Sequence, residues 1–178
     1  MRRLLPLLLL IALPLAASDA SSTYFANVTL VDQDGKTQDL YALMKDRTIV
    51  MNTFFTSCEV SCPIMARTFA SLQDRFADRI GKDLVLVSIT VDPATDTPER
   101  MKAYATKMKA KSGWYFLTGT KEQVDLALKK IGLSVDVRDN HLNVMLAGND
   151  KTGLWKKLNG MASSEELAKL VASVVDDR

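Results

Sequence analysis

The sequence has few of the side chains that bind soft metals or form disulfides. Among its 178 residues are only two cysteines, Cys58 and Cys62, and one histidine, His141. A zinc site with four cysteine ligands, or with two cysteines and two histidines, cannot be built from this inventory within one chain. A fold held together by many disulfides is excluded as well. Metal or thiol chemistry in this chain must therefore depend on these three residues.

The sequence also lacks an excess of charge of either sign. Its 23 Lys and Arg residues nearly balance its 21 Asp and Glu residues, so no surplus of positive charge favours a phosphate backbone. We expect no nucleic-acid partner. Hydrophobic residues make up 47% of the chain and charged residues 25%. This composition and length are typical of one folded globular domain, and they exclude both a disordered chain and a polytopic membrane protein.

The first twenty residues have the pattern of a secretory signal peptide. A positive Met1-Arg2-Arg3 precedes an apolar run from Leu4 to Ala17, and small residues follow up to Ala20. An uncleaved membrane anchor is the alternative, but this run would span about 21 Å as a helix, short of the ~30 Å hydrocarbon core. We expect residues 1–20 to direct export, in a bacterium to the periplasm. Any membrane contact would be through an uncleaved N-terminus.

Residues 21–178 are expected to form one α/β domain. Residues 21–27 are small and polar, which predicts a short linker. Strand patterns alternate with helical ones, which indicates an α/β sandwich with a mixed central sheet and an N-terminal β-hairpin. The expected strands are 27–30 with 36–40 (the hairpin), 48–55, 84–91, 115–117, 135–137, and 142–147 with 154–158; the expected helices are 63 to Gly81, 97–109, 121–131 and 164–175. A strand, a CxxxC motif and a helix in succession make the fold thioredoxin-like.

The two cysteines lie at a predicted strand-to-helix turn. A helix N-terminus stabilises thiolate over thiol, and thiolates both attack disulfides and bind copper. Three residues separate Cys58 from Cys62, where thioredoxin-type motifs have two. The longer loop allows a disulfide, but it also lets two thiolates converge on Cu(I) or Zn(II), and His141 is the one imidazole that can complete a three-coordinate site. A structural disulfide and a solvated histidine are the alternatives, and Met65 is expected in the core.

Three segments in this order resemble the Sco/SenC family of copper proteins. They are TSCEVSCPIM at 56–65, VSITVDPATDTP at 87–98 followed by Tyr104, and DNH at 139–141, and the resemblance covers about residues 24–175. It implies a thioredoxin-like fold, copper as Cu(I) or Cu(II) bound by Cys58, Cys62 and His141, and a chaperone role in building the copper A centre of cytochrome c oxidase. Asp92 matches an acidic position near the metal in relatives. It would orient His141 or tune the charge of the site, unless it is only a turn residue.

The resemblance also implies partners and an alternative activity. The partners would be subunit II of cytochrome c oxidase, or a similar copper acceptor, and an upstream periplasmic copper donor. In the alternative, a thiol–disulfide oxidoreductase, Cys58 attacks the disulfide of the acceptor and Cys62 resolves the mixed disulfide. A third hypothesis, that the chain is a peroxidase-like enzyme, rests on fold analogy alone. Glu59 and Ser61 depart from the family pattern, which often has Pro after the first cysteine and a β-branched residue before the second.

Overall fold

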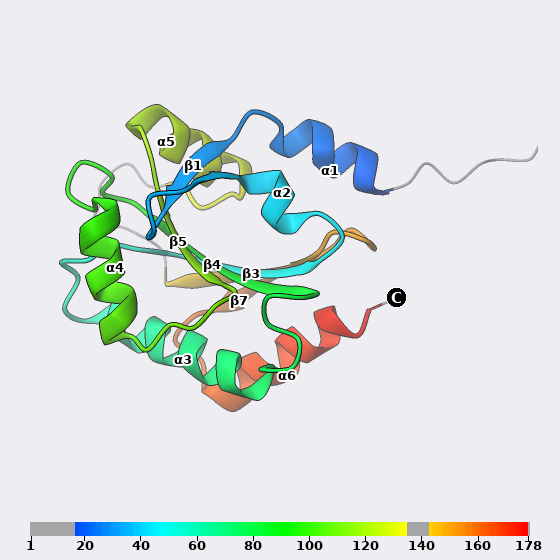
Figure 1. Cartoon of the computed structure of the whole chain (residues 1–178). Helices are drawn as coiled ribbons and strands as arrows, with labels where there is room; N and C mark the ends of the chain where they lie inside the picture. Colours follow the sequence, from blue (N-terminus) through cyan, green and yellow to red (C-terminus); the bar gives the residue numbers. More distant parts are fainter. Residues whose placement is uncertain (1–16, 135–142, 178) are drawn as a thin grey trace, which may run out of the picture.

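The computed structural model of the chain describes residues 17–134 and 143–177, and this part forms a seven-stranded mixed sheet with helices on both faces (Figure 1). The fold class expected from the sequence is confirmed. The strands are β1 (Thr29–Asp32), β2 (Thr37–Asp39), β3 (Thr48–Phe54), β4 (Leu84–Thr90), β5 (Trp114–Thr118), β6 (Val144–Asn149) and β7 (Leu154–Asn159). The helices are α1 (Ala17–Phe25), α2 (Leu40–Met44), α3 (Ser61–Arg75), α4 (Pro98–Lys107), α5 (Lys121–Lys130) and α6 (Ser164–Val175).

The strand order is β2-β1-β5-β4-β3-β6-β7, with β3 and β4 near the centre. Every residue of β3 and β4 is buried, as expected for apolar runs covered on both faces. These two strands run parallel, with Phe54 opposite Thr90, whereas β6 runs antiparallel to β3. Because parallel strands end at the same edge, the loops that follow β3 and β4 lie next to each other.

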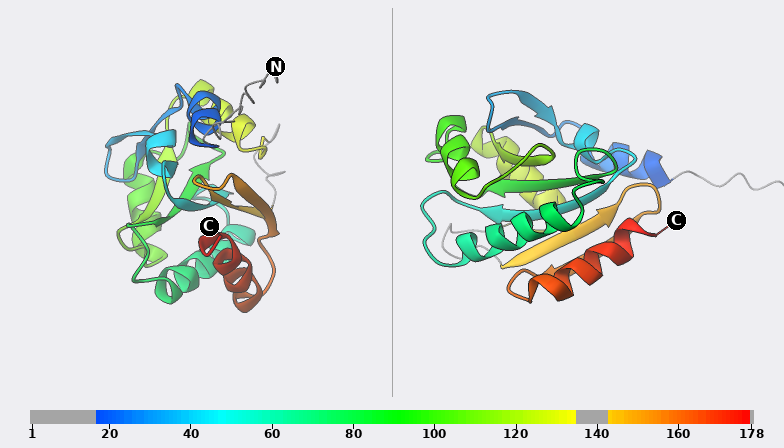
Figure 2. Two further views of the ribbon diagram at one scale, coloured as in Figure 1. Left: turned by 90° about the vertical axis from the view of Figure 1, so that its right-hand side faces the viewer. Right: turned by 60° about the horizontal axis from the view of Figure 1, so that its bottom comes forward.

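Side chains alternate between the two faces of the sheet. On β3, Val50 and Phe54 join the core beneath α3, α4 and α6, whereas Ile49 and Met51 join the core beneath α1, α2 and α5. Two views of the ribbon show α3 and α6 together on one face of the sheet (Figure 2). The sheet therefore separates two hydrophobic cores, and the helix α3 that follows the first cysteine belongs to the first of them.

Two expectations about element boundaries were wrong. Residues 21–27 are not simply a linker, because α1 extends to Phe25, which is buried and lies 6.2 Å, ring to ring, from Trp155. The Tyr24 hydroxyl also donates to the backbone oxygen of Lys130 at 2.9 Å, so tertiary contacts hold this helix in place. In addition, α3 ends at Arg75 rather than near Gly81, and turns connect it to β4. The expected strand 135–137 lies outside the described residues.

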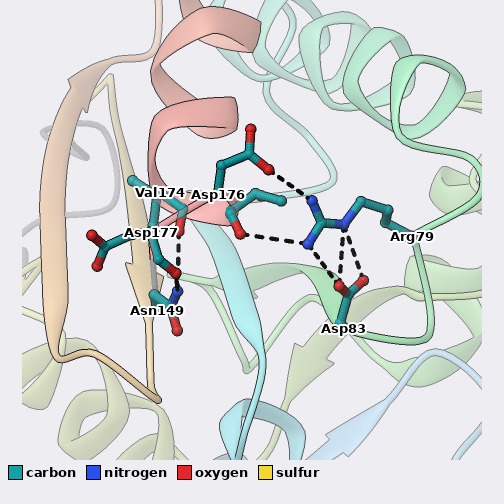
Figure 3. Close-up of polar contacts among 7 residues, drawn as sticks. Arg79, Asp83, Asn149, Val174, Asp176 and Asp177 are labelled. Atoms are coloured by element: carbon teal, nitrogen blue, oxygen red, sulfur yellow. Dashed lines mark hydrogen bonds and ion pairs between the residues drawn. The ribbon is translucent and has the colours of Figure 1, made fainter.

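Polar contacts fasten α6 to the end of the sheet opposite the cysteines (Figure 3). Arg79 forms ion pairs with Asp83 at 2.7 Å and with Asp176 at 3.1 Å. The side chain of Asn149 donates to the backbone oxygens of Val174 and Asp177. These contacts join the end of α3, the start of β4 and the end of α6. No helix within residues 17–134 and 143–177 is both long and apolar enough to cross a membrane.

Candidate functional site

The two cysteines lie in the connection from β3 to α3. The backbone N–H of Cys58 donates to the oxygen of Phe55 at 3.1 Å, which turns the chain away from the sheet. The helix begins at Ser61, two residues before the expected start, so Cys62 belongs to its first turn. The backbone N–H of Cys62 donates to Sγ of Cys58 at 3.3 Å. No disulfide joins the two residues, and the turn brings the sulfur of Cys58 to the N-terminus of α3.

The two thiols have different environments. Burial opposes ionisation of Cys58, but hydrogen bonds from the Cys62 side chain and backbone, from Ser61 and from Val60 outweigh it, so the pKa of Cys58 lies below its ordinary value. Cys62 is only 1% exposed. Its burial, together with its hydrogen bond to Cys58, raises the pKa of Cys62 to about 12. Cys58 is therefore the more acidic and the more accessible of the two thiols.

One side of the motif faces solvent and the other faces the core. Val60, between the two cysteines, is 74% exposed, and Glu59 is exposed as well. Met65, one turn beyond Cys62, is fully buried in the core under α3, which confirms it as a packing residue. A partner or an ion can approach the motif from the side of Val60, where Cys58 is partly exposed and Cys62 is buried.

A buried carboxylate that the sequence analysis did not single out holds the cysteine loop to the sheet. Asp96 is fully buried and accepts hydrogen bonds from the backbone N–H of Thr56 at 3.2 Å and from the Thr56 hydroxyl. It also accepts from the hydroxyl of Thr90, at the end of β4. Asp96 therefore joins the two loops at this edge of the sheet. Its signal in the sequence is its place directly before Thr97, the residue that caps α4.

The other residues predicted for the site are only partly placed. Asp92 lies in the loop after β4, where its backbone N–H donates to the Thr90 hydroxyl at 2.9 Å. His141 lies outside the described residues. Among those that are described, no three His, Cys, Asp or Glu side chains group closely enough to hold a metal ion. Asp92 and the two cysteines thus do not form such a group by themselves, and the metal roles of these residues and of His141 stay predictions.

The edge that carries the cysteines is also where β6 begins. β6 is antiparallel to β3, with Met145 opposite Asn52, so its first residues lie toward the end of β3. The described chain resumes at Asn143, whose backbone oxygen accepts from the N–H of Gly160 at 2.9 Å. A Cβ atom added to Gly160 would lie 2.8 Å from the sulfur of Met65. Asn143 and the first half of α3 are therefore neighbours through Gly160.

Comparison with known proteins finds one family over nearly the whole chain. The family model of SCO1/SenC matches residues 16–174. The SCO1 protein homolog of Bacillus subtilis is 36% identical over 93 residues, which are 51% of this chain and 47% of that protein. The chain spans about half the length of the curated relatives it matches.

Solved structures share the fold. BsSco, which is described as a member of the Sco family of cytochrome c oxidase assembly proteins and as having a disulfide switch, superposes with a TM-score of 0.69 at 25% identity, covering 84% of this chain and 92% of that one. Arabidopsis thaliana ScoI, solved with copper bound, superposes with a TM-score of 0.70 at 23% identity, covering 83% and 94%. The family model matches residues 16–174, and the structure has the mixed sheet and the strand-to-helix cysteine motif that the sequence indicates for this family. This chain belongs to the SCO1/SenC family.

Proposed function

We propose that this chain is a copper chaperone. It holds copper through the thiolates of Cys58 and Cys62 and the imidazole of His141, and it passes the ion to an acceptor protein during assembly of the copper A centre of cytochrome c oxidase. Export through the N-terminal segment would bring the protein to the compartment where that acceptor exposes its site. The chain acts as a carrier in this proposal, so copper is its cargo.

The observation that carries the proposal is the placing of the two cysteines on one turn. Sγ of Cys58 lies 3.3 Å from the backbone nitrogen of Cys62, and no disulfide joins the two residues. Two thiolates are soft donors, and soft donors select Cu(I) over harder ions. Cys58 is the more accessible of the two, which suits an ion that must leave by exchange with the ligands of a partner.

Chain connectivity supports His141 as the third ligand. His141 precedes Asn143 by two residues, and consecutive Cα atoms are about 3.8 Å apart. Asn143 is a neighbour, through Gly160, of the helix that carries Cys62. A described neighbour of the cysteine helix thus follows His141 by two residues, which supports the choice of this histidine as the third ligand. Relatives support the choice of metal, because Arabidopsis thaliana ScoI and the yeast Sco1 were both solved with copper bound.

Copper titration of the reduced protein tests the proposal. We expect one copper ion per chain and, for Cu(II), a visible thiolate-to-copper charge-transfer band. The variant His141→Ala loses one of three ligands, so its copper affinity should fall by at least about 100-fold, more than the loss of a residue that only supports a ligand. The thiols must be reduced first, because a disulfide offers no thiolate.

Asn143→Ala is the matched control for this variant. It removes an exposed side chain from the same segment but leaves the backbone oxygen that Gly160 uses. We expect it to bind copper as the unmodified chain does. Unchanged stoichiometry and affinity in His141→Ala would contradict the ligand set proposed above.

A thiol–disulfide oxidoreductase is the second candidate, and the difference between the thiols favours it. The lowered pKa of Cys58 increases its thiolate fraction near neutral pH, whereas Cys62 stays protonated until it is needed to resolve a mixed disulfide. This function needs no histidine. Reduction of a short peptide that contains the disulfide of a copper acceptor should therefore continue in His141→Ala and stop in Cys58→Ser.

A further inference from the structure

The exposed side of α4 and the turn that follows it carry only positive charge after Glu99. From residue 100 to residue 111 the sequence has five basic residues and no acidic one, whereas the rest of the chain has more acidic than basic residues. The five are all exposed, and together we call them the basic face: Arg100, Lys102, Lys107, Lys109 and Lys111. The other side of α4 is buried in the core beneath α3, α4 and α6. The positive charge of the chain is therefore concentrated on one outer surface.

Two members of the basic face lie at positions where α4 itself favours another residue. Arg100 is the third residue of the helix, and a positive charge near a helix N-terminus opposes the helix dipole. Lys109 has a φ of 58°, in the left-handed region that favours glycine. It lies at the C′ position of a Schellman motif, since its N–H donates to the oxygen of Thr106 and the N–H of Ala110 donates to the oxygen of Ala105. Both residues break a local rule of the helix, which indicates a role outside it.

The ion pairs of the basic face leave most of its charge available. Lys111 pairs with Asp74 at 2.6 Å, and Lys102 pairs with Asp34, but all four side chains are exposed. Exposed pairs contribute little to stability, so a carboxylate of a partner can replace either of these two. In the described part of the chain, the other three members of the basic face form no ion pair.

A cleft beside the basic face adds a third lysine to two of its members. The cleft has a volume of about 430 Å³ and lies between α4 and the hairpin of β1 and β2, with Lys36, Lys102 and Lys111 in its lining. Its acidic lining residues already have partners. Asp32 accepts three hydrogen bonds from its own hairpin, and Asp34 pairs with Lys102. The cleft therefore offers ammonium groups to a carboxylate that enters from outside.

The basic face begins at the edge of the sheet where the cysteine motif lies. Asp96, directly before the cap of α4, accepts hydrogen bonds from Thr56 in the cysteine loop. Figure 1 shows α4 and the loop from β3 to α3 at the same side of the molecule. The ten residues of α4 span about 15 Å, and a standard interface covers about 800 Å² of each partner, or about 30 Å across. One partner can therefore cover both Cys58 and the basic face.

We propose that the basic face is the docking surface for the protein that receives copper from Cys58, and that this partner presents a cluster of Asp and Glu side chains to it. The inference rests on the proposed function and adds the chemistry by which the acceptor is recognised. Opposite charges increase the rate of encounter and orient two proteins before they touch. Because the charges are exposed, they speed association without making the complex permanent, which suits a carrier that must leave after delivery.

The double variant Arg100→Glu with Lys109→Gly tests the docking surface without weakening the fold. Glutamate in the first turn and glycine at a left-handed position both suit α4, so the unfolding midpoint should not fall. The partner in the test is the metal-free copper A domain of cytochrome c oxidase subunit II from the same organism, mixed with the reduced chain in a stopped-flow instrument. At low salt the association rate should fall at least about tenfold. At about 1 M salt the variant and the unmodified chain should converge, because salt screens the charges.

Lys129→Glu with Lys157→Gln is the matched control. It changes the net charge of the chain by the same amount, at exposed positions on α5 and β7. We expect this control to associate at nearly the rate of the unmodified chain. If the test variant associates with the domain as fast as the control does at low salt, the docking surface is refuted, whereas copper binding is judged separately by titration.

Two other outcomes separate this proposal from its alternatives. If the unmodified chain docks through the basic face but binds no copper, only the proposed function is refuted. If the test variant loses binding to phosphatidylglycerol vesicles but not to the copper A domain, the basic face contacts a membrane and the docking surface is refuted.

Discussion

Asp96 offers the sharpest test of how the fold positions the cysteine loop. The carboxylate is fully buried, and it accepts from the N–H and hydroxyl of Thr56 and from the hydroxyl of Thr90. The hydroxyl of Thr90 is already engaged as an acceptor, because the N–H of Asp92 donates to it. The variant Asp96→Ala therefore leaves three donors without their acceptor, and one of them, the Thr90 hydroxyl, belongs to a fully buried residue.

The expected loss of stability follows from these contacts. Hydrogen bonds to a charged group contribute about 1.5–3 kcal/mol each, so three of them set a ceiling of roughly 5–9 kcal/mol. Removing the carboxylate also removes the cost of burying it, which offsets part of that loss. We expect Asp96→Ala to lower the free energy of unfolding by about 3–4 kcal/mol. Asp96→Asn keeps one carbonyl acceptor and should cost about half as much.

Urea unfolding of the reduced, metal-free protein, followed by tryptophan fluorescence, measures both variants. Asp125→Ala is the matched control, because Asp125 is exposed and its ion pair with Lys121 contributes about 0.5 kcal/mol or less. A double-mutant cycle with Thr90→Val should give a coupling of about 1 kcal/mol, since the two residues share a hydrogen bond. If Asp96→Ala unfolds within about 0.5 kcal/mol of the unmodified chain, Asp96 does not hold the loop.

Two further predictions concern the thiols and the far hairpin. Iodoacetamide should modify Cys58 well before Cys62, because the pKa of Cys58 is lowered and that of Cys62 is raised to about 12. The rate of Cys58 modification should reach half its maximum below pH 9. Mass spectrometry measures both rates, and equal rates would contradict this prediction. Gly148→Ala should cost about 1–3 kcal/mol and shift tryptophan emission, since the added Cβ would lie 2.4 Å from the ring of Trp155. An unchanged spectrum and urea midpoint would show that the ring moves freely.

Much of the fold could be predicted because its signals are local. The apolar run at 48–55 predicts a buried strand, and Thr97 followed by Pro98 predicts the start of a capped helix. Both elements occur where the sequence indicates. The hairpin that begins the domain follows from the turn ending at Gly35, which has a φ of 76°. In these segments the residue pattern and the tertiary environment favour the same structure, so no long-range information is needed.

The wrong or missed predictions concern residues whose structure depends on contacts with residues far away in the sequence. Residues 21–27 were expected to be a linker because they are mostly small and polar, yet Phe25 packs against Trp155, which lies far away in the sequence. The role of Asp96 depends in the same way on Thr56, forty residues earlier. Nothing in a single sequence shows which of two acidic residues after β4 points to the cysteine loop. The hydrogen bonds from the cysteine loop and from Thr90 reach Asp96, and the role that the resemblance implies for Asp92 stays a prediction.

Because the two thiols differ in pKa, the two candidate functions should depend on pH in different ways. In the proposed exchange reaction Cys58 attacks first, so the rate would stop rising with pH once that thiol is ionised, at a pH below the ordinary pKa of a cysteine. The proposed copper site needs both thiolates, so the ion would have to displace a proton from Cys62, whose pKa is raised to about 12. Copper affinity therefore keeps increasing with pH above the point where exchange levels off.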